Sequence, residues 1–465
     1  MRRHIYDDDI WYSFGLCYVK LATRLCYRRF HVSGWQRVPK EGSVILVSNH
    51  TNALMDPLVM LLAEGRKVVF MARADIFRKP FIRKVLTWLR ILPIYRIRDG
   101  YGAVRDNDKA IAEAVEVLKH HTPLCLYPEG THRTKHSLLR LGKGLFHIAL
   151  DAHDAGAQPV YIVPVGIEYS NYFRFRADVE MQVGEPINVS QFAEDFSRAT
   201  EETSPTKYEE SISRAEEGKN SSGEGISADA KGKSQSDDAN RARLMNALRD
   251  KLTTSLQGLF SWVPDDDDYE ALWELAQLRT ARFHPLSLRE ATVLNQREIK
   301  QLLSEREKAP EAMRTLFQKS LSFKDEREAK HISVGSTSWN HPLWRVIIRA
   351  LGLLVTLPLM VTCAAISLPV WLVATLLVRR AKDPAWSNTW RFAACLPLMP
   401  LIVVGVAIAA FSHLAWGWAL ALTLLSVLSI PVVYDWMEQL RRLVSDWRWL
   451  RSPSLRAKLA SLLQY

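Results

Sequence analysis

Residues 43–58 read SVILVSNHTNALMDPL, an apolar run that ends in a short polar turn. The run from Ser43 to Ser48 has the length and the branched aliphatic residues of a buried β-strand. The turn that follows it carries His50 and, six positions later, Asp56. If this turn leads into a helix, the Asp56 carboxylate reaches one imidazole nitrogen and leaves the other facing a substrate. The stretch therefore predicts a general base held in its working tautomer.

A base of this kind suits acyl transfer to an alcohol, because a hydroxyl attacks well only as its proton is removed. No nucleophilic side chain of the protein is then needed. A single His and Asp near a turn can equally cap a helix or satisfy the backbone. This segment alone leaves both interpretations open.

The pattern of the first strand continues to about Val189. Short apolar runs alternate with helical stretches, which predicts an α/β domain at residues 34–198, with a mixed sheet flanked by helices and with sites at the strand ends. The predicted strands are 43–48, 67–72, 93–97, 124–127, 161–167 and 179–183, and the predicted helices include 81–90, 102–119 and 144–155.

A second apolar run also ends in a polar turn. Glu129 can orient a hydroxyl or an arginine, and Gly130 and Thr131 allow a close approach of the backbone. Arg133 and Lys143 supply cations for a phosphate. Taken alone, such a turn is also a common structural feature. The stretch reads LCLYPEGTHR at 124–133, and LGKG follows at 141–144.

Together the two segments resemble the first and third sequence blocks of the phospholipid and glycerol acyltransferase family, which joins acyl thioesters to glycerolipid hydroxyls. Two further stretches follow the same order: LPIYR at 92–96 resembles the second block, and IVPV at 162–165 resembles the fourth. The resemblance implies that His50 is the base, that Asp56 holds it, and that Arg96 binds the acceptor phosphate. Arg98 is a close rival for this role. The fourth block is ascribed to binding of the acyl donor.

The chain departs from the family pattern at two positions. Five residues separate His50 from Asp56, one more than is usual, and His132 stands directly after Thr131, where an arginine is usual. The longer spacing resembles the branch that contains fungal glycerol-3-phosphate and dihydroxyacetone-phosphate acyltransferases and their bacterial relatives. This implies one of those two acceptors, with a lysophospholipid such as lysophosphatidate as the alternative. It also implies acyl-CoA or acyl carrier protein as donor, and neither a cofactor nor a metal.

Charge indicates the type of partner. The 465-residue chain has a formal net charge of +11, which suits nucleic acid, a membrane surface or anionic small molecules. Basic residues lie beside aromatic ones near both ends, as expected in a lipid headgroup layer. No nucleic-acid-binding module is recognised. We therefore expect a lipid bilayer as partner and no nucleic acid. A non-catalytic membrane scaffold with this fold is a further alternative, against which the intact His50, Asp56 and Glu129 argue.

The segments on either side of the α/β domain differ in composition. Residues 1–33 have an amphipathic pattern that is too charged to span a bilayer, which predicts a membrane-surface helix or a helix packed on the soluble domain. Residues 199–240 are polar and small, which predicts a disordered linker. A helical region is expected at 241–340. Its Asp265 to Asp268 run lacks the pattern of a calcium loop and indicates a solvated helix start.

The C-terminal third contains two long apolar blocks, Val346 to Val378 and Phe392 to Tyr434. The second can hold two spans, whereas the first is long for one span and short for two. Basic residues flank both blocks, so the positive-inside rule places these flanks in the cytosol. Each block must then enter the bilayer and return to the cytosolic side. This predicts two membrane hairpins at 341–440, the first re-entrant or short, and a basic cytosolic tail at 441–465. The chain is then an integral membrane protein with its catalytic domain on the cytosolic face.

Overall fold

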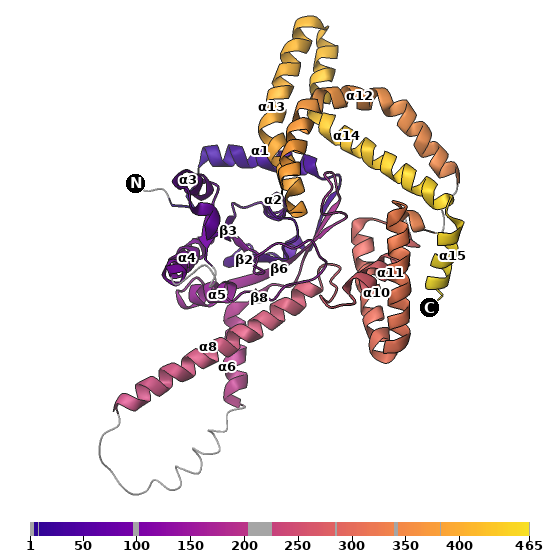
Figure 1. Cartoon of the computed structure of the whole chain (residues 1–465). Helices are drawn as coiled ribbons and strands as arrows, with labels where there is room; N and C mark the ends of the chain where they lie inside the picture. Colours follow the sequence, from indigo (N-terminus) through magenta and orange to yellow (C-terminus); the bar gives the residue numbers. More distant parts are fainter. Residues whose placement is uncertain are drawn as a thin grey trace.

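The computed structural model describes residues 4–7, 9–95, 102–202, 226–283, 286–338, 343–381 and 383–464. Figure 1 shows a sheet domain, a bundle of helices beside it, and long C-terminal helices that extend away from one side of the sheet domain. The predicted α/β domain and the predicted apolar helices are therefore both present.

A mixed sheet forms the centre of the first part. Its strand order is β1-β7-β6-β2-β5-β3-β4, and β8 pairs with β6. β2 lies parallel to both of its neighbours, β5 and β6, whereas β6 is antiparallel to β7 and β8. The mixed sheet is as predicted. The strands are β1 (Phe30–Ser33), β2 (Ser43–Ser48), β3 (Val69–Arg73), β4 (Ile91–Ile94), β5 (Leu124–Leu126), β6 (Val160–Tyr169), β7 (Val179–Val183) and β8 (Ile187–Asn188).

Two layers of helices cover the sheet. Alternate residues of β2 point to opposite faces, so Ile45 joins the core beneath one layer and Leu46 the core beneath the other. The first layer contains α4 (Gly102–Lys119), α5 (Gly144–Asp154) and α8 (Ile226–Gln257), and the second contains α1 (Ile10–Cys26) and α2 (Met55–Ala63). β2 is therefore enclosed on both faces, and the polar turn that follows it and carries His50 is attached to a rigid strand.

Six of the strands agree with the sequence prediction, but β1 and β8 were missed. β1 lies inside the segment 1–33 that was predicted as a surface helix, and it pairs with β7. This part of the prediction is wrong: α1 ends at Cys26 and the sheet domain starts at β1. The physical reason is that β1 is a short edge strand, partly exposed, without the apolar run that marks a buried strand.

The predicted linker, 199–240, is helical at both of its ends. α6 (Val189–Glu202) extends into it and α8 begins at Ile226, while residues 203–225 lie outside the described residues. α8 places Leu248, Leu252 and Leu256 in the core of the sheet domain, each fully buried. The sheet domain therefore continues beyond the predicted boundary at 198. The polar sequence of the first half of α8 concealed this, because the fully buried residues that α8 adds to this core lie in its second half.

The packing of α8 can be tested through one leucine. Replacing Leu252 with Ala should lower the free energy of unfolding by about 2–5 kcal/mol, because the substitution leaves a cavity in a close-packed core. Lys251→Ala, at the exposed neighbouring position of the same helix, is the matched control. Denaturant unfolding of the full chain in detergent measures both. Equal stability of the two variants would show that α8 does not belong to this core.

A helical bundle lies beside the sheet domain. It is formed by α9 (Tyr269–Ala281), α10 (Leu288–Lys308), α11 (Pro310–Ala329) and α15 (Pro453–Leu462). α9 starts at Tyr269, directly after the acidic run at which a helix start was predicted. This run is paired rather than only solvated, since Asp266 and Asp268 lie 2.7 and 3.0 Å from Arg306. The segment predicted as a basic cytosolic tail, 441–465, is helical over most of its length. Leu455, Leu459 and Leu462 form a buried stripe that docks α15 into the bundle.

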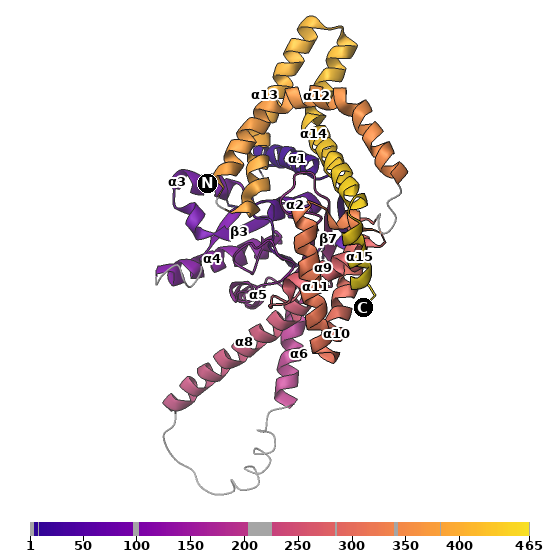
Figure 2. The ribbon, with the colours of Figure 1, turned by 45° about the vertical axis from the view of Figure 1, so that its right-hand side comes forward.

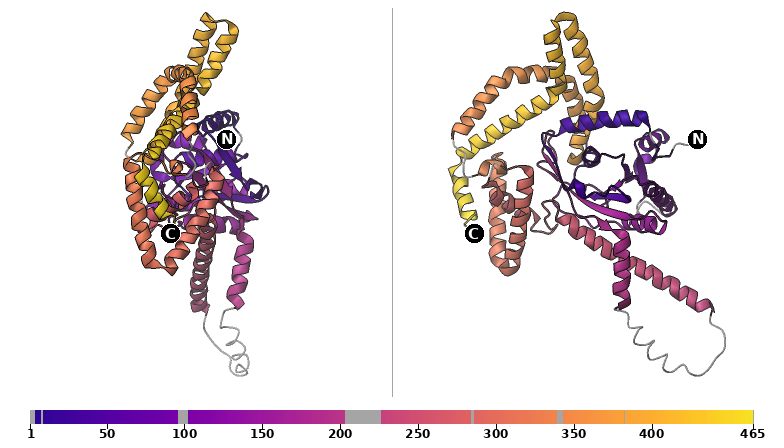
Figure 3. Two further views of the ribbon diagram at one scale, coloured as in Figure 1. Left: turned by 90° about the vertical axis from the view of Figure 1, so that its right-hand side faces the viewer. Right: turned by 180° about the vertical axis from the view of Figure 1, so that it is seen from behind.

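Three C-terminal helices are long and apolar enough to cross a membrane: α12 (Leu343–Arg380), α13 (Ser387–His413) and α14 (Trp416–Leu450). α13 and α14 form the predicted hairpin. The first block is one helix rather than two, because Pro358 and Pro369 bend the helix without ending it. In Figure 1 and in both views of Figure 3, α12 forms an arch. Val370 and Ala374, in its C-terminal half, join the second core of the sheet domain.

Candidate active site

The polar segments predicted from the sequence meet at one edge of the sheet. Because β5 and β6 both run parallel to β2, the carboxyl ends of all three strands lie at the same edge. His50 follows β2, Glu129 follows β5, and Tyr169 is the last residue of β6. Residues far apart in the sequence are thereby brought within hydrogen-bonding distance of one another.

His50 and Asp56 form the predicted pair. The Nδ1 atom of His50 lies 2.8 Å from Oδ2 of Asp56, which stands in the first turn of α2. The Asp56 side chain is fully buried, whereas that of His50 is 18% exposed. An imidazole that is held through Nδ1 keeps Nε2 for a substrate. The arrangement can therefore act as a general base whose tautomer is fixed by a carboxylate.

Further hydrogen bonds hold the Asp56 carboxylate. Its Oδ2 atom also accepts from the backbone N–H groups of Thr51 and Asn52, each at 2.8 Å. The Tyr169 hydroxyl donates to Oδ1 at 2.7 Å. Burial, and next the charge of Asp56, raises the pKa of Tyr169 well above its ordinary value, so this hydroxyl remains a donor. Such a network keeps a buried carboxylate in place although it is removed from water.

The imidazole and the turn that carries it are fixed independently. The ring of His50 stacks on that of Tyr127 with centroids 4.4 Å apart. Asn49, almost fully buried, donates from Nδ2 to the carbonyl of Ile167 at 3.0 Å and accepts from the Ile167 N–H at 2.8 Å. The turn after β2 is thus joined to β6 on one side, and the ring cannot tilt freely.

Glu129 joins the two sequence blocks. Its carboxylate accepts from the backbone N–H of His50 at 2.8 Å and from that of Leu139 at 2.9 Å. Burial raises the pKa of the Glu129 carboxyl, an effect that these two hydrogen bonds partly offset. Gly130 adopts a positive φ of 67° in the same turn, next to the half-buried Thr131. Glu129 therefore orients the backbone around His50, and its predicted role toward a hydroxyl or an arginine stays a prediction.

The predicted phosphate-binding cations do not all face this edge. The guanidinium of Arg133 contacts Asp265 and donates to the Ser137 hydroxyl at 2.6 Å, so it is directed toward the helical bundle. Lys143 is exposed at the start of α5. Arg96 and its rival Arg98 lie outside the described residues, although β4, the strand before them, ends at Ile94 and runs parallel to β3.

The buried fourth block and a second histidine complete the site. Ile162, Val163 and Val165 lie in the middle of β6 with no exposed surface, so this segment supports the sheet. His132, in contrast, presents its ring edge-on to His50 with centroids 5.7 Å apart. The Nε2 atom of His132 lies 3.0 Å from Oδ2 of Asp383, which belongs to the connection between α12 and α13.

Comparisons with known proteins show what this part of the chain is similar to. Residues 29–168 match the family model described as Acyltransferase. The sheet domain belongs to the acyltransferase family. A 1-acyl-sn-glycerol-3-phosphate acyltransferase of Borreliella burgdorferi is 26% identical over 155 residues, which are 33% of this chain and 57% of that protein. An uncharacterized acyltransferase of Schizosaccharomyces pombe is 25% identical over 179 residues, 36% of this chain and 26% of that protein.

One solved structure is also similar. The crystal structure of the 1-acyl-sn-glycerophosphate acyltransferase PlsC from Thermotoga maritima has 22% sequence identity and a TM-score of 0.30, and the match covers 39% of this chain and 73% of that one. The aligned part of this chain thus spans about half the length of one curated relative and a quarter of the other. The acyltransferase match ends at residue 168, before α6 and all later helices.

The sequence prediction missed several residues of this candidate site. Tyr169 and Asn49 lie at strand ends on the edge that was predicted to carry the site. The expectation that sites lie at the carboxyl ends of strands could therefore have included them. Asp383 could not be found in this way, because its contact with His132 depends on how the apolar helices return to the domain.

Proposed function

We propose that this chain transfers a fatty acyl group from acyl-CoA or acyl carrier protein to a hydroxyl of glycerol 3-phosphate or dihydroxyacetone phosphate. The observation that carries the proposal is the His50–Asp56 pair, with its buried carboxylate and partly exposed imidazole, in a domain of the acyltransferase family. Arg96 and Lys143 are the proposed cations for the acceptor phosphate. Thr131 belongs to the turn that is proposed to lie beside the acceptor.

The proposed reaction needs no covalent enzyme intermediate. Nε2 of His50 takes the proton of the acceptor hydroxyl as its oxygen attacks the thioester carbonyl. Backbone N–H groups stabilise the negative oxygen of the tetrahedral intermediate. The intermediate collapses to the ester, the carbon–sulfur bond breaks, and His50 returns the proton to the leaving thiolate. Asp56 stabilises the imidazolium between these two steps.

A lysophospholipid is the second candidate acceptor. One curated relative is named for acylation of 1-acyl-glycerol 3-phosphate, and the same base would activate the remaining hydroxyl of that substrate. Purified protein in liposomes, given labelled acyl-CoA with glycerol 3-phosphate, dihydroxyacetone phosphate or lysophosphatidate in turn, separates the candidates. Labelled product only with lysophosphatidate would replace the first proposal with the second, and no product with any acceptor would contradict both.

The bilayer is the proposed partner of α1 as well as of the long helices. Ile10, Trp11 and Phe14 of α1 are each more than 70% exposed, and the Tyr18 hydroxyl of the same helix contacts the Leu396 carbonyl of α13. α3 (Pro80–Trp88) lies against α1 through a hydrogen bond from Trp88 to Asp9, and it exposes further apolar and basic residues. Figure 2 shows α1 directly beneath the arch of long helices. Exposed aromatic residues beside cations suit a headgroup layer.

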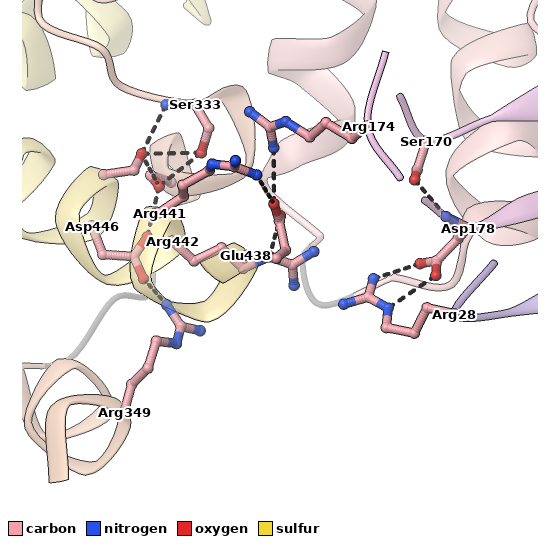
Figure 4. Close-up of polar contacts among 12 residues, drawn as sticks. Arg28, Ser170, Arg174, Asp178, Ser333, Arg349, Glu438, Arg441, Arg442 and Asp446 are labelled. Atoms are coloured by element: carbon pink, nitrogen blue, oxygen red, sulfur yellow. Dashed lines mark hydrogen bonds and ion pairs between the residues drawn. The ribbon is translucent and has the colours of Figure 1, made fainter. Parts of the chain in front are cut away.

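Contacts of the long helices support one arrangement in the membrane. Asp383, between α12 and α13, contacts His132, and Glu438 of α14 lies 3.1 Å from Arg174 of the sheet domain. Figure 4 shows this second contact together with the pair between Arg349 of α12 and Asp446 of α14. These contacts support placing both ends of α12 on the same side of the bilayer as the catalytic domain. We propose that α12 enters the bilayer and returns, that the α13–α14 hairpin crosses it, and that the catalytic domain is cytosolic.

This arrangement predicts a labelling pattern. Single cysteines at Ala381, Ser412 and Ser454 in a cysteine-free chain would be treated with an impermeant thiol reagent in sealed, oriented vesicles. We expect labelling from the lumenal or external face only at position 412, because the other two positions lie on the side of the catalytic domain. Labelling of position 381 from that face would show that α12 crosses once.

A further inference from the structure

The connection between α12 and α13 touches the catalytic edge of the sheet. It contains the short helix η5 (Pro384–Trp386), which begins after Asp383. Oδ1 of Asp383 accepts from the Ala385 N–H at 2.9 Å, and Oδ2 lies 3.0 Å from Nε2 of His132. Ala385 itself is buried. The connection is therefore folded against the domain.

His132 lies between the catalytic pair and this connection. Its ring is edge-on to His50, with centroids 5.7 Å apart, and edge-on to Trp386, with centroids 5.6 Å apart. The His132 side chain is only 17% exposed, although it follows a strand end at the surface of the domain. Trp386, Asp383 and His50 all contact it. Residues of the C-terminal helices thus form one wall beside His50.

Hydrogen bonds also hold the connection at its C-terminal end, where α13 begins. At the start of α13, Asn388 donates to the Tyr172 carbonyl at 2.7 Å, and Arg391 donates to the Phe173 carbonyl at 2.6 Å. These carbonyls belong to the segment directly after β6, whose last residue, Tyr169, holds Asp56. The beginning of α13 is therefore tied to the strand that supports the catalytic carboxylate, and the position of Asp383 is set by contacts at both ends.

We propose that the Asp383–Trp386 connection is part of the active site: Asp383 positions the ring of His132, and His132 binds the polar end of the acyl acceptor. The inference rests on the proposed function. The acceptor hydroxyl must lie at Nε2 of His50 to lose its proton. The His132 ring is in edge contact with the His50 ring, so the polar group next to that hydroxyl would lie near His132. Because Asp383 engages Nε2 of His132, the ring acts on the acceptor through Nδ1.

The position next to the base assigns His132 to the acceptor rather than to the acyl donor. Asp383 fixes the direction of the imidazole in the way that a carboxylate orients a histidine in other polar sites. Trp386 also contacts this ring edge-on. The helices that follow the family domain would then contribute to recognition of the acceptor, in addition to holding the protein in the bilayer.

The test uses the full chain in liposomes and separates the Michaelis constants of the two substrates. Asp383→Asn should raise the KM for the acceptor about 10- to 100-fold, the loss expected for a hydrogen bond to a charged group, while kcat and the KM for acyl-CoA stay unchanged. Asp250→Asn, at a carboxylate that is 78% exposed on α8, is the matched control and should behave like the wild type.

A double-mutant cycle distinguishes positioning from general support of the fold. If Asp383 acts through His132, Asp383→Asn should have no further effect in a His132→Gln chain. Trp386→Ala should also raise the acceptor KM, and Trp386→Phe, which keeps an aromatic edge contact, should restore it. Additive effects, or equal changes in both Michaelis constants, would overturn the proposal.

The failure of this inference is distinguishable from failure of the proposed function. Loss of activity in His50→Ala together with wild-type kinetics in Asp383→Asn would reject only the role of the connection. Activity that survives His50→Ala would reject the reaction mechanism itself. Thermal unfolding of each variant in the same liposomes identifies any chain that is inactive because it fails to fold.

Discussion

Replacing His50 with Ala should lower kcat by about 100- to 10,000-fold or more, because a general base contributes about this much to proton transfer. The Asp56 carboxylate would remain in its network, since Thr51, Asn52 and Tyr169 still donate to it. The substitution should therefore leave the fold and the membrane association unchanged. Turnover of labelled acyl-CoA by the purified chain in liposomes measures the loss.

A matched control is available for this substitution. His31 is an exposed histidine of β1, at the end of the sheet away from β2, so His31→Ala should keep wild-type activity. The stacking of His50 on Tyr127 is lost in His50→Ala, and unfolding curves show whether this affects stability. A correctly folded His50→Ala chain with wild-type turnover would exclude His50 as the base.

The parts of the fold that were predicted correctly are those with local signals. β2 and β5 are short apolar runs that end in polar turns, and their parallel pairing places His50 and Glu129 at one edge. Hydrophobic periodicity marks such strands without knowledge of their partners. The geometry of the His50–Asp56 pair follows from its spacing at a strand-to-helix turn, since Asp56 stands in the first turn of α2.

The parts that were not predicted depend on long-range packing. The first half of α8 looks like a linker because its sequence is polar, yet its second half completes the core through Leu252. α12 remains one helix through Pro358 and Pro369, because proline bends a helix that its neighbours support. Arg133 is bound to Asp265, a contact between segments that the sequence separates widely. No pattern of neighbouring residues encodes these contacts.

Asp56 should be nearly as important as His50, and two substitutions separate its charge from its hydrogen bonds. In Asp56→Asn the amide oxygen can accept from the donors that now reach Oδ2, and the amide nitrogen can face the Tyr169 hydroxyl. The packing is kept, but a neutral amide does not stabilise the imidazolium. We expect kcat to fall by about 100- to 10,000-fold with little loss of stability.

Asp56→Ala should add a loss of stability to the loss of activity. The backbone N–H groups of Thr51 and Asn52 would then be buried without an acceptor. Each such donor costs about 1–3 kcal/mol, so the free energy of unfolding should fall by at least about 2 kcal/mol relative to Asp56→Asn. Turnover and denaturant unfolding of both variants provide the comparison. If Asp56→Asn kept wild-type kcat, the carboxylate would serve only to fold the turn; equal stability of the two variants would mean that its hydrogen bonds do not hold this turn.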